Sequence, residues 1–299
     1  MSLRVLEPGL LTLVVDRGRP ASLHLGVPLG GAADRASFLL GNALVGNPPD
    51  AAALEICLAG PTLRATCDVG CALAGAPFDV QLGGERLLVG RSFMLHEGET
   101  LRIAGTKIGA RAYLCVGGGL REPIVLGSRS ALEPVRRGQE LSCGPSHVRP
   151  RSFGDEKPQA TWGEGLVTLR ALPGPQADWF DLKQFFGQSY RVTPTSNRMG
   201  VRLAGEALTR PVRELLSEPV APGTVQVVND GQCIVLGVDG QTIGGYPKVA
   251  QVIDADLDYI GQVRPGQDVH FVSVGMDEAE AAFRVREVAL NEWVTRLTL

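Results

Sequence analysis

Residues 225–248 read VQVVNDGQCIVLGVDGQTIGGYPK and give the clearest indication of the fold class. Two apolar runs, Val225–Val228 and Ile234–Val238, flank the turn-forming residues Asn229-Asp230-Gly231. Apolar runs on both sides of such a turn predict a β-hairpin. A second turn, Gly244-Gly245-Tyr246-Pro247, follows shortly afterwards. The stretch is therefore typical of β structure joined by short turns.

The same pattern of short apolar runs and Gly or Pro turns recurs along the rest of the chain. The further runs that predict strands are Leu11–Val15, Val69–Leu73, Phe93–Leu95, Leu101–Ile103, Ala112–Val116, Leu166–Leu172 and Val269–Val274. A composition with 38 glycines, 20 prolines and 5% aromatic residues fits a β-barrel or a β-sandwich. The segments that predict helices are Asp34–Leu44, Gln176–Phe186, Val212–Leu216 and Asp277–Trp293. We predict a mainly β fold with a few accessory helices.

The length of the chain predicts its division into domains. A chain of 299 residues is long enough for about two domains of ordinary size. Residues 146–164 are polar, contain Pro150 and Pro158, and show neither strand nor helix periodicity. We therefore predict an N-terminal β domain over residues 1–145, a linker over 146–164, and a C-terminal β domain over 165–299.

Composition argues against several classes of protein. The formal net charge is -3 and Lys and Arg do not cluster, which argues against a nucleic-acid partner. The N-terminus carries neither a membrane-length apolar stretch nor a signal-peptide pattern, so we expect a cytoplasmic protein without a membrane partner. The six cysteines lie in apolar runs and are expected to be buried thiols. The four histidines have no ligand spacing, so no metal site is predicted.

Familiar cofactor and nucleophile motifs are also missing from the sequence. There is no phosphate-binding loop of the Gly-x-x-x-x-Gly-Lys-Ser/Thr type and no Gly-x-Ser-x-Gly nucleophile elbow. No lysine stands beside a methionine, as biotin attachment requires. A nucleotide site is therefore not identifiable from sequence, and any biotin would arrive on another chain.

Polar residues are concentrated in three stretches, of which the first lies near the N-terminus. It contains Asp16-Arg17-Gly18-Arg19, a Gly-rich loop over residues 26–33, and Asp34 before a predicted helix. Backbone N–H groups of such a loop can bind an anion. The alternative, which we favour for two residues of this stretch, is structural: Asp34 caps the helix and Asn47 ends it.

The second stretch is Asn197-Arg198-Met199-Gly200-Val201-Arg202. In an extended segment, positions 198, 200 and 202 face one side, so Arg198 and Arg202 can converge. A guanidinium grips a carboxylate or phosphate through two hydrogen bonds. A surface ion pair fits the spacing equally well.

The third stretch places Asp239, Gln241 and Thr242 at a predicted strand end, beside the Gly-Gly-Tyr-Pro turn. A carboxylate, an amide and a hydroxyl together can hold the N–H and C=O groups of a urea-like or lactam substrate. A glycine-rich turn also lets a ligand approach the backbone. The alternative is a polar hairpin tip without a ligand.

Motifs spread over nearly the whole chain resemble those of a known family. They are Pro8-Gly9, Asp16–Arg19, Gly26-Val27-Pro28, Asn42–Asn47, Leu54-Glu55, Gly60-Pro61, Val116–Gly119, Leu126–Ser130, Asn197–Leu203, Gly231–Lys248 and Arg264-Pro265-Gly266. On these motifs the chain resembles the C-subunit family of 5-oxoprolinases, also described as biotin-dependent carboxyltransferase or allophanate hydrolase subunit 2. It departs from the family pattern at Val15, Ile243 and Ala131-Leu132, which leaves the substrate open.

The resemblance implies a fold of two cyclophilin-like β-barrel domains and a function shared with other chains. It implies a smaller sister subunit, a third oxoprolinase subunit, and ATP as a co-substrate for opening the lactam 5-oxoproline. The expected catalytic residues are Asp239, Gln241 and Thr242, which would orient the amide and stabilise developing charge. The expected substrate-binding residues are Arg198, Arg202, Asn197, Gln232, Tyr246, Asp16 and Arg19.

Two other functions are compatible with the same resemblance. One is a carboxyltransferase of the urea carboxylase type that uses biotin supplied in trans. The other is a regulatory binding protein that antagonises a kinase inhibitor. We favour the oxoprolinase hypothesis, because free-standing members of the family usually belong to that system.

Overall fold

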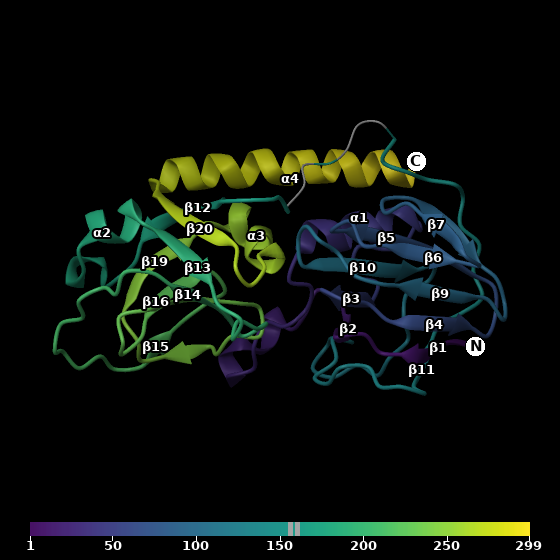
Figure 1. The fold of residues 1–299 in the computed structure, drawn as a ribbon, viewed down its shortest axis with the longest axis horizontal. Coiled ribbons are helices and arrows are strands. Elements are labelled where there is room, and N and C mark those ends of the chain that lie inside the picture. Colours follow the sequence, from purple (N-terminus) through teal and green to yellow (C-terminus); the bar gives the residue numbers. More distant parts are fainter. Residues whose placement is uncertain (155–157, 159–161) are drawn as a thin grey trace. The chain divides into compact units, whose positions relative to one another are not determined.

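The computed structural model describes residues 1–154, 158 and 162–299, and Figure 1 shows its elements. The chain folds into two compact units. Unit 1 comprises Met1–Gly18, Asp34–Trp162 and Ala289–Leu299, and unit 2 comprises Arg19–Ala33 and Gly163–Val288. Residues 155–157 and 159–161 of the predicted linker lie outside the described residues. The domain boundaries predicted from the sequence, at residues 145 and 165, are not tested by this division and remain predictions.

Unit 1 contains two antiparallel sheets. The strands of the six-stranded sheet, in spatial order, are β11 (Glu140–Ser142), β1 (Ser2–Glu7), β4 (Thr62–Ala65), β9 (Thr100–Ile103), β6 (Val80–Leu82) and β7 (Glu85–Leu87). The strands of the five-stranded sheet are β2 (Leu11–Val15), β3 (Ala53–Cys57), β10 (Arg111–Val116), β5 (Val69–Gly75) and β8 (Ser92–Leu95). Helix α1 (Arg35–Leu44) packs against β5 and β10.

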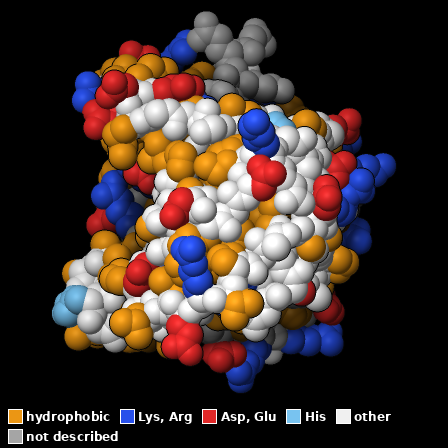
Figure 2. All heavy atoms as spheres, turned by 90° about the vertical axis from the view of Figure 1, so that its left-hand side faces the viewer, with side chains coloured by type: hydrophobic (Ala, Val, Ile, Leu, Met, Phe, Trp, Pro, Cys, Tyr) orange, Lys and Arg blue, Asp and Glu red, His pale blue; other side chains and the backbone are white. Residues whose placement is uncertain are grey.

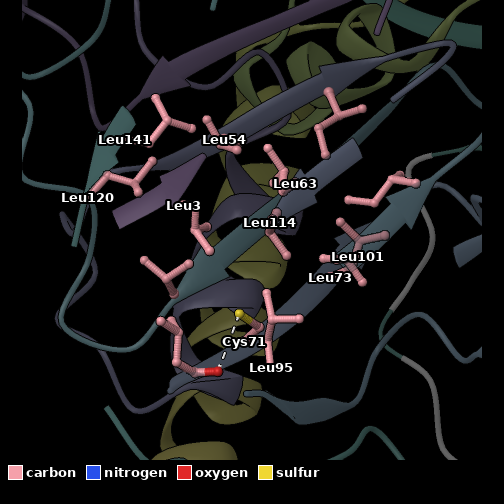
Figure 3. Close-up of a cluster of buried hydrophobic side chains, with 14 of the residues drawn as sticks. Leu3, Leu54, Leu63, Cys71, Leu73, Leu95, Leu101, Leu114, Leu120 and Leu141 are labelled. Atoms are coloured by element: carbon pink, nitrogen blue, oxygen red, sulfur yellow. Dashed lines mark hydrogen bonds between the residues drawn. The ribbon is translucent and has the colours of Figure 1, made fainter. Parts of the chain in front are cut away.

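Leucines dominate the core of unit 1, as Figure 3 shows in close-up. Leu54 and Leu114 come from the five-stranded sheet, and Leu63 and Leu101 come from the six-stranded sheet. Strands β4 and β9 alternate buried and more exposed side chains, whereas β3 and β10 are buried along nearly their whole length. One face of each sheet contributes to a shared apolar cluster. Cys71 belongs to the same cluster, which agrees with its prediction as a buried thiol.

Unit 2 contains a closed barrel of seven strands. In spatial order they are β12 (Val167–Pro173), β19 (Lys248–Val252), β16 (Thr224–Val227), β17 (Cys233–Leu236), β14 (Gly200–Ala204), β13 (Ser189–Val192) and β20 (Asp268–Ser273). Only the pairing of β12 with β20 is parallel. Closure leaves this barrel without an unpaired edge. Its interior is filled by aliphatic side chains and by the packed rings of Phe185, Tyr190 and Phe271.

A two-stranded ribbon and several short helices complete unit 2. The ribbon pairs β15 (Glu218–Pro219) with β18 (Ile243–Gly244). The helical segments are η1 (Pro20–Leu25), η2 (Ala177–Trp179), α2 (Leu182–Gly187), η3 (Asp254–Asp256) and α3 (Leu257–Gln262). The last helix of the chain is α4 (Met276–Thr298), whose residues up to Val288 belong to unit 2. No described helix combines the length and apolarity that membrane crossing requires.

The predicted mainly β class is confirmed, and so is the hairpin from which the prediction started. Strands β16 and β17 pair around a turn in which the Gly231 N–H donates to the Val228 carbonyl. Gly231 has a φ of 79°, a conformation that favours glycine. Of the two implied barrels, the strands of unit 2 close one by continuous pairing, whereas the described strands of unit 1 form two separate sheets.

The helices predicted over Asp34–Leu44 and Asp277–Trp293 are confirmed as α1 and α4, and the one predicted over Gln176–Phe186 forms two pieces, η2 and α2. The N-cap residue Asp34 accepts hydrogen bonds from the N–H and hydroxyl of Ser37, and Asn47 donates to the carbonyl of Val116 after α1 ends. The helix predicted over Val212–Leu216 is wrong, because these residues form no helix. Val212 and Leu216 are exposed, so no apolar face is buried to stabilise a short helix there.

Candidate functional site

The structure brings one residue from each of the three polar stretches into a single contact within unit 2. The Arg198 guanidinium donates from Nε to Oδ2 of Asp239 (2.6 Å) and from Nη2 to Oδ1 of Asp239 (2.9 Å). Nη2 also donates to the carbonyl oxygen of Gly31 (2.8 Å). A guanidinium with its donors in a fixed plane is suited to such a two-oxygen grip. Segments far apart in the sequence thus meet at Arg198.

The Gly-rich loop of the first stretch is held against the barrel by its backbone. Gly30 N–H donates to the carbonyl of Val238 (2.8 Å), and Arg19 N–H donates to the carbonyl of Leu29 (2.6 Å). Both Gly30 and Gly31 have positive φ angles, of 64° and 77°. Glycine is required at such angles to avoid strain. Because the N–H of Gly30 donates to Val238, this N–H is not available to an anion.

The turn after β17 places Asp239 by a similar use of glycine. Asp239 N–H donates to the carbonyl of Arg198 (3.2 Å), and Gly240 N–H donates to the carbonyl of Gly237 (3.0 Å). A Cβ atom on Gly237 would lie 2.3 Å from the carbonyl oxygen of Arg198. Only glycine allows this close approach of the two backbones. The sequence Gly-Val-Asp-Gly therefore fixes the carboxylate beside the guanidinium.

The burial of the two charges differs. The side chain of Arg198 is 7% exposed, whereas that of Asp239 is 36% exposed. The buried cation is thus paired and hydrogen-bonded, as burial of a charge requires. The carboxylate keeps one edge toward solvent in a fixed orientation. Asp239 can accept an N–H from a ligand at that edge, while Arg198 serves to position it.

The other expected residues of the second stretch lie in different surroundings. Arg202 is exposed on β14, so its guanidinium does not share the buried environment of Arg198. The side-chain oxygen of Asn197 accepts from the N–H groups of Met199 (2.9 Å) and Gly200 (3.3 Å). Asn197 thus closes a turn, which is the structural use of this residue type. Binding roles for Arg202 and Asn197 stay predictions.

The expected residues of the third stretch also lie in different surroundings. Gln232 bonds the backbone of Gly205 through both its amide atoms, so it stabilises the barrel locally. Arg210 lies over the ring of Tyr246, with its guanidinium carbon 5.8 Å from the ring centroid. Gln241 is exposed and Thr242 is half-buried, both directly after the Asp239 turn. Their assigned roles in catalysis and binding stay predictions.

The two expected binding residues of the first stretch belong to different units: Asp16 lies in unit 1 and Arg19 in unit 2. The Asp16 carboxylate accepts hydrogen bonds from the Ser128 hydroxyl (2.5 Å), the Ser130 hydroxyl (2.7 Å) and the Arg129 N–H (2.6 Å). Burial raises the pKa of Asp16, but these hydrogen bonds outweigh it, so the pKa lies below its usual 3.8. Asp16 therefore organises the Gly-Ser-Arg-Ser loop of unit 1.

A further polar cluster, which the sequence analysis did not select, lies on the barrel of unit 2. Nζ of Lys248 is 2.6 Å from Oε2 of Glu218, and Gln176 accepts from the Lys248 N–H through its side-chain oxygen (3.0 Å). Gln226 is the pairing partner of Lys248 in the sheet. The available signal was a lysine at the start of an apolar strand, Lys248–Val252. We refer to Lys248, Gln226, Glu218 and Gln176 as the lysine cluster.

The described residues contain no group of histidine, cysteine, aspartate or glutamate side chains suited to a metal ion.

On the face drawn in Figure 2, acidic and basic side chains are scattered among apolar ones. Such a mixture is typical of an ordinary solvated surface.

Comparison with known proteins identifies the family. Residues 25–273 match the family described as "Carboxyltransferase domain, subdomain A and B". The chain belongs to the carboxyltransferase-domain family. The match covers Gly31, Arg198, Asp239 and the lysine cluster, so all the polar groups of unit 2 described above, apart from Arg19, lie within the family region.

Three relatives show how far this similarity extends. The chain is 37% identical to the C subunit of 5-oxoprolinase from Escherichia coli K12 over 309 aligned residues, which cover 99% of this chain and 98% of that protein. It is 26% identical to urea amidolyase of Saccharomyces cerevisiae, covering 97% of this chain but 18% of that protein. The crystal structure of Kluyveromyces lactis urea amidolyase matches 98% of this chain and 20% of that chain, with 27% identity and a TM-score of 0.88.

Proposed function

We propose that this chain is part of an ATP-dependent 5-oxoprolinase complex, which hydrolyses 5-oxoproline to glutamate. The observation that carries the proposal is the 37% identity to the C subunit of Escherichia coli 5-oxoprolinase over nearly the full length of both chains. The urea amidolyases match this chain over a fifth of their own length or less. Coverage of nearly the whole of the Escherichia coli subunit therefore favours the oxoprolinase hypothesis.

The geometry of unit 2 supports a role in binding a planar amide. The Asp239 carboxylate is held by two hydrogen bonds from Arg198 and keeps a solvent-facing edge. That edge can accept the N–H of a lactam, and the amide of Gln241, two residues further on, can donate to the lactam carbonyl. A preorganised acceptor costs no rearrangement when the substrate binds. Arg198 acts as a positioning residue in this proposal.

ATP enters the proposal as a co-substrate of the complex, and no step is assigned to it on this chain. The Gly-rich loop of unit 2 does not suit a phosphate group, because the N–H groups of Gly26 and Gly30 already donate to the carbonyls of Leu23 and Val238. The proposed partners are a smaller sister subunit and a third subunit that completes ring opening. Activity is expected only when all three chains are present. The complex is expected to act in the cytoplasm.

The test is phosphate release from ATP that depends on 5-oxoproline, measured with the three purified subunits together and with each omitted. We expect turnover only in the complete mixture. Asp239→Asn should lower the rate by about a hundredfold without preventing assembly, because it removes the fixed acceptor charge. An assembled complex without any turnover would refute the proposal. Full activity of Asp239→Asn and Arg198→Met would instead favour a regulatory role.

A second function, carboxyl transfer with biotin supplied in trans, is favoured by one observation. The family description is that of a carboxyltransferase domain, and the fold matches urea amidolyase with a TM-score of 0.88. In this case the amide held by Asp239 would be urea. Transfer of labelled carboxylate from a carboxylated biotin carrier to urea, measured with this chain present and absent, separates the two functions.

A further inference from the structure

The lysine cluster contains a pair of polar side chains on the outside of the barrel of unit 2. Gln226 and Lys248 are partners across strands β16 and β19, at an irregularity in the register between Val225 and Gln226. Val225 and Val227, on either side of Gln226, point into the barrel core. Since successive side chains of a strand point to opposite faces, Gln226 faces outward. Lys248, opposite to it, stands next to Gln226 on the same strand pair.

This outward pair is nevertheless buried. Gln226 is 2% exposed and Lys248 is 4% exposed. An outer face of a barrel is normally open to solvent, so another part of unit 2 must lie over it. The ribbon of β15 and β18 supplies Glu218, which contacts Lys248, and Gly244, which lies against Gln226. The ribbon therefore forms a cover above the pair.

Two buried nitrogen atoms of this pair have hydrogen-bonding capacity that the described residues do not satisfy. They are Nε2 of Gln226 and Nζ of Lys248. Nζ lies 2.6 Å from Oε2 of Glu218 and forms an ion pair with it. An ammonium has three donors, so one carboxylate contact leaves further donors available. Buried donors without acceptors are rare in native proteins and call for an explanation.

Glu218 is the movable part of the cluster. Its side chain is 40% exposed, and the ammonium of Lys248 holds its pKa below the usual range. Nε2 of Gln176 donates to the same oxygen of Glu218 over a long distance of 3.4 Å. The carboxylate of Glu218 can therefore turn toward water and remain hydrated there. Its departure would free Lys248 for another anion.

Gly244 in the ribbon packs tightly against Gln226. A Cβ atom at Gly244 would lie 2.5 Å from Nε2 of Gln226 and 2.8 Å from Nε2 of Gln241. Both distances are shorter than real Cβ atoms allow, so any larger residue here would displace the two amides. The buried pair is thus adjacent to Gln241, two residues after Asp239. A ligand held there would lie close to the amide-binding residues proposed above.

We propose that Lys248 and Gln226 bind the carboxylate of a small acid, with Glu218 occupying Lys248 until the ligand arrives. One cationic donor and one amide donor, side by side and buried, match a carboxylate in charge and in number of acceptor oxygens. A phosphate group presents more oxygens and would leave several of them unpaired. The identity of the acid as 5-oxoproline rests on the proposed function; the carboxylate site itself does not.

Lysine-selective NMR of the full chain tests this assignment directly. The chain has only four lysines, Lys107, Lys157, Lys183 and Lys248, so labelled side chains give few signals, and Lys248→Arg identifies the relevant one. We expect 5-oxoproline to shift the Lys248 signal in a saturable manner. 2-Pyrrolidinone has the same lactam without the carboxylate and should not shift it. Inorganic phosphate should bind more weakly than the acid, and tighter phosphate binding would overturn the carboxylate assignment.

Variants separate binding from folding. Lys248→Met and Gln226→Met should each raise the dissociation constant of the acid by about tenfold or more. Lys183→Met is the matched control, because Lys183 is an exposed lysine of the same unit, and it should leave the constant unchanged. If Lys248→Met fails to fold, Gln226→Met still tests the site with the ion pair intact. Unchanged affinity in a folded Gln226→Met variant would overturn the proposal.

Failure of the proposed function can be told apart from failure of this inference. If 5-oxoproline neither turns over nor binds, the substrate is wrong, and acetate and succinate then serve as probes. A saturable shift of Lys248 with either acid keeps the carboxylate site. No shift with any of the three acids overturns it, even if the assembled complex hydrolyses 5-oxoproline.

Discussion

Each unit of the molecule has a buried polar cluster between strands, and the two clusters differ in how completely they are hydrogen-bonded. In unit 1, Nε of Arg111 donates to Oε1 of Glu55 (3.1 Å), and the Tyr113 hydroxyl donates to Oε2 of Glu55 (2.8 Å). The Asp34 N–H donates in turn to the Tyr113 oxygen (2.7 Å). Burial and the nearby Glu55 charge raise the pKa of Tyr113 well above 10.0, so its hydroxyl remains a donor.

In unit 2, the lysine cluster is incomplete, since Gln226 and Lys248 have buried donors without acceptors among the described residues. A network in which every member is paired rigidifies a core, whereas an unsatisfied one destabilises it. Residues that lower the stability of the fold and make no compensating contact are expected at functional sites. The comparison supports the proposal that unit 2 holds the binding chemistry, whereas the buried charges of unit 1 are paired within a complete network.

The largest effect is expected from breaking the complete cluster of unit 1. Arg111→Met leaves Glu55 buried without its cation and should lower the free energy of unfolding by about 3–5 kcal/mol. Urea unfolding followed by circular dichroism measures the change. The double variant Glu55→Met with Arg111→Met should recover most of the loss, because no lone charge remains. A loss below about 1 kcal/mol in the single variant would contradict the structural role assigned to this cluster.

An intermediate effect is expected from the ion pair of unit 2. Arg198→Met should lower the free energy of unfolding by about 1–3 kcal/mol, less than Arg111→Met, because Asp239 is partly exposed and remains hydrated. It should also lower 5-oxoproline-dependent ATP hydrolysis, since Asp239 loses its fixed orientation. Arg198→Lys keeps the charge but not the two-oxygen grip, so it should restore stability more than activity. If Arg198→Lys restored stability and activity to the same extent, a positioning role for Arg198 would be contradicted.

A smaller effect of opposite sign is expected at Gln226. Gln226→Met removes a buried donor that has no acceptor among the described residues, so it should raise the free energy of unfolding by about 1 kcal/mol while weakening ligand binding. Gln251 is the matched control on the neighbouring strand, because it accepts from Thr224 (2.8 Å) and donates to the Pro222 carbonyl (2.9 Å). Gln251→Met should therefore destabilise the protein. Destabilisation by both variants would show that Gln226 has a structural partner.

The parts of the fold that could be predicted from the sequence are those determined by local interactions. The hairpin around Asn229-Asp230-Gly231 depends on turn chemistry within a few residues, and α1 depends on the cap of Asp34. The helix predicted over Val212–Leu216 failed because its stability would have depended on burial, and the segment is exposed. Closure of a barrel in unit 2, against two sheets in unit 1, depends on pairings between distant strands that no local pattern reveals.

In the candidate site, too, local features could be predicted from the sequence and contacts between distant residues could not. The sequence identified the stretches that contain Gly31, Arg198 and Asp239, because charged and amide side chains are concentrated there beside glycine-rich turns. It could not show that Arg198 bonds to Asp239 rather than lying with Arg202, since only the folded barrel brings residues 198 and 239 together. Gln226 was missed because a glutamine between two valines is typical of a solvent-facing strand position, and only the ribbon of β15 and β18 buries it.

Asp16 gives the smallest expected effect and tests whether the second polar cluster of unit 1 is also structural. Its folded-state pKa is lowered, since the hydrogen bonds from Ser128 and Ser130 outweigh burial. A lowered pKa contributes stability that is complete above the unfolded value of about 3.8 and is lost as pH falls below it. Wild-type stability should therefore fall below that pH more steeply than that of Asp16→Asn, by at most about 1.4 kcal/mol per pH unit for one proton. Urea unfolding from about pH 5 down to about pH 3 measures both slopes. Parallel slopes would mean that Asp16 gains nothing from these hydrogen bonds, and the contrast between the units would then rest on Glu55 and Arg111 alone.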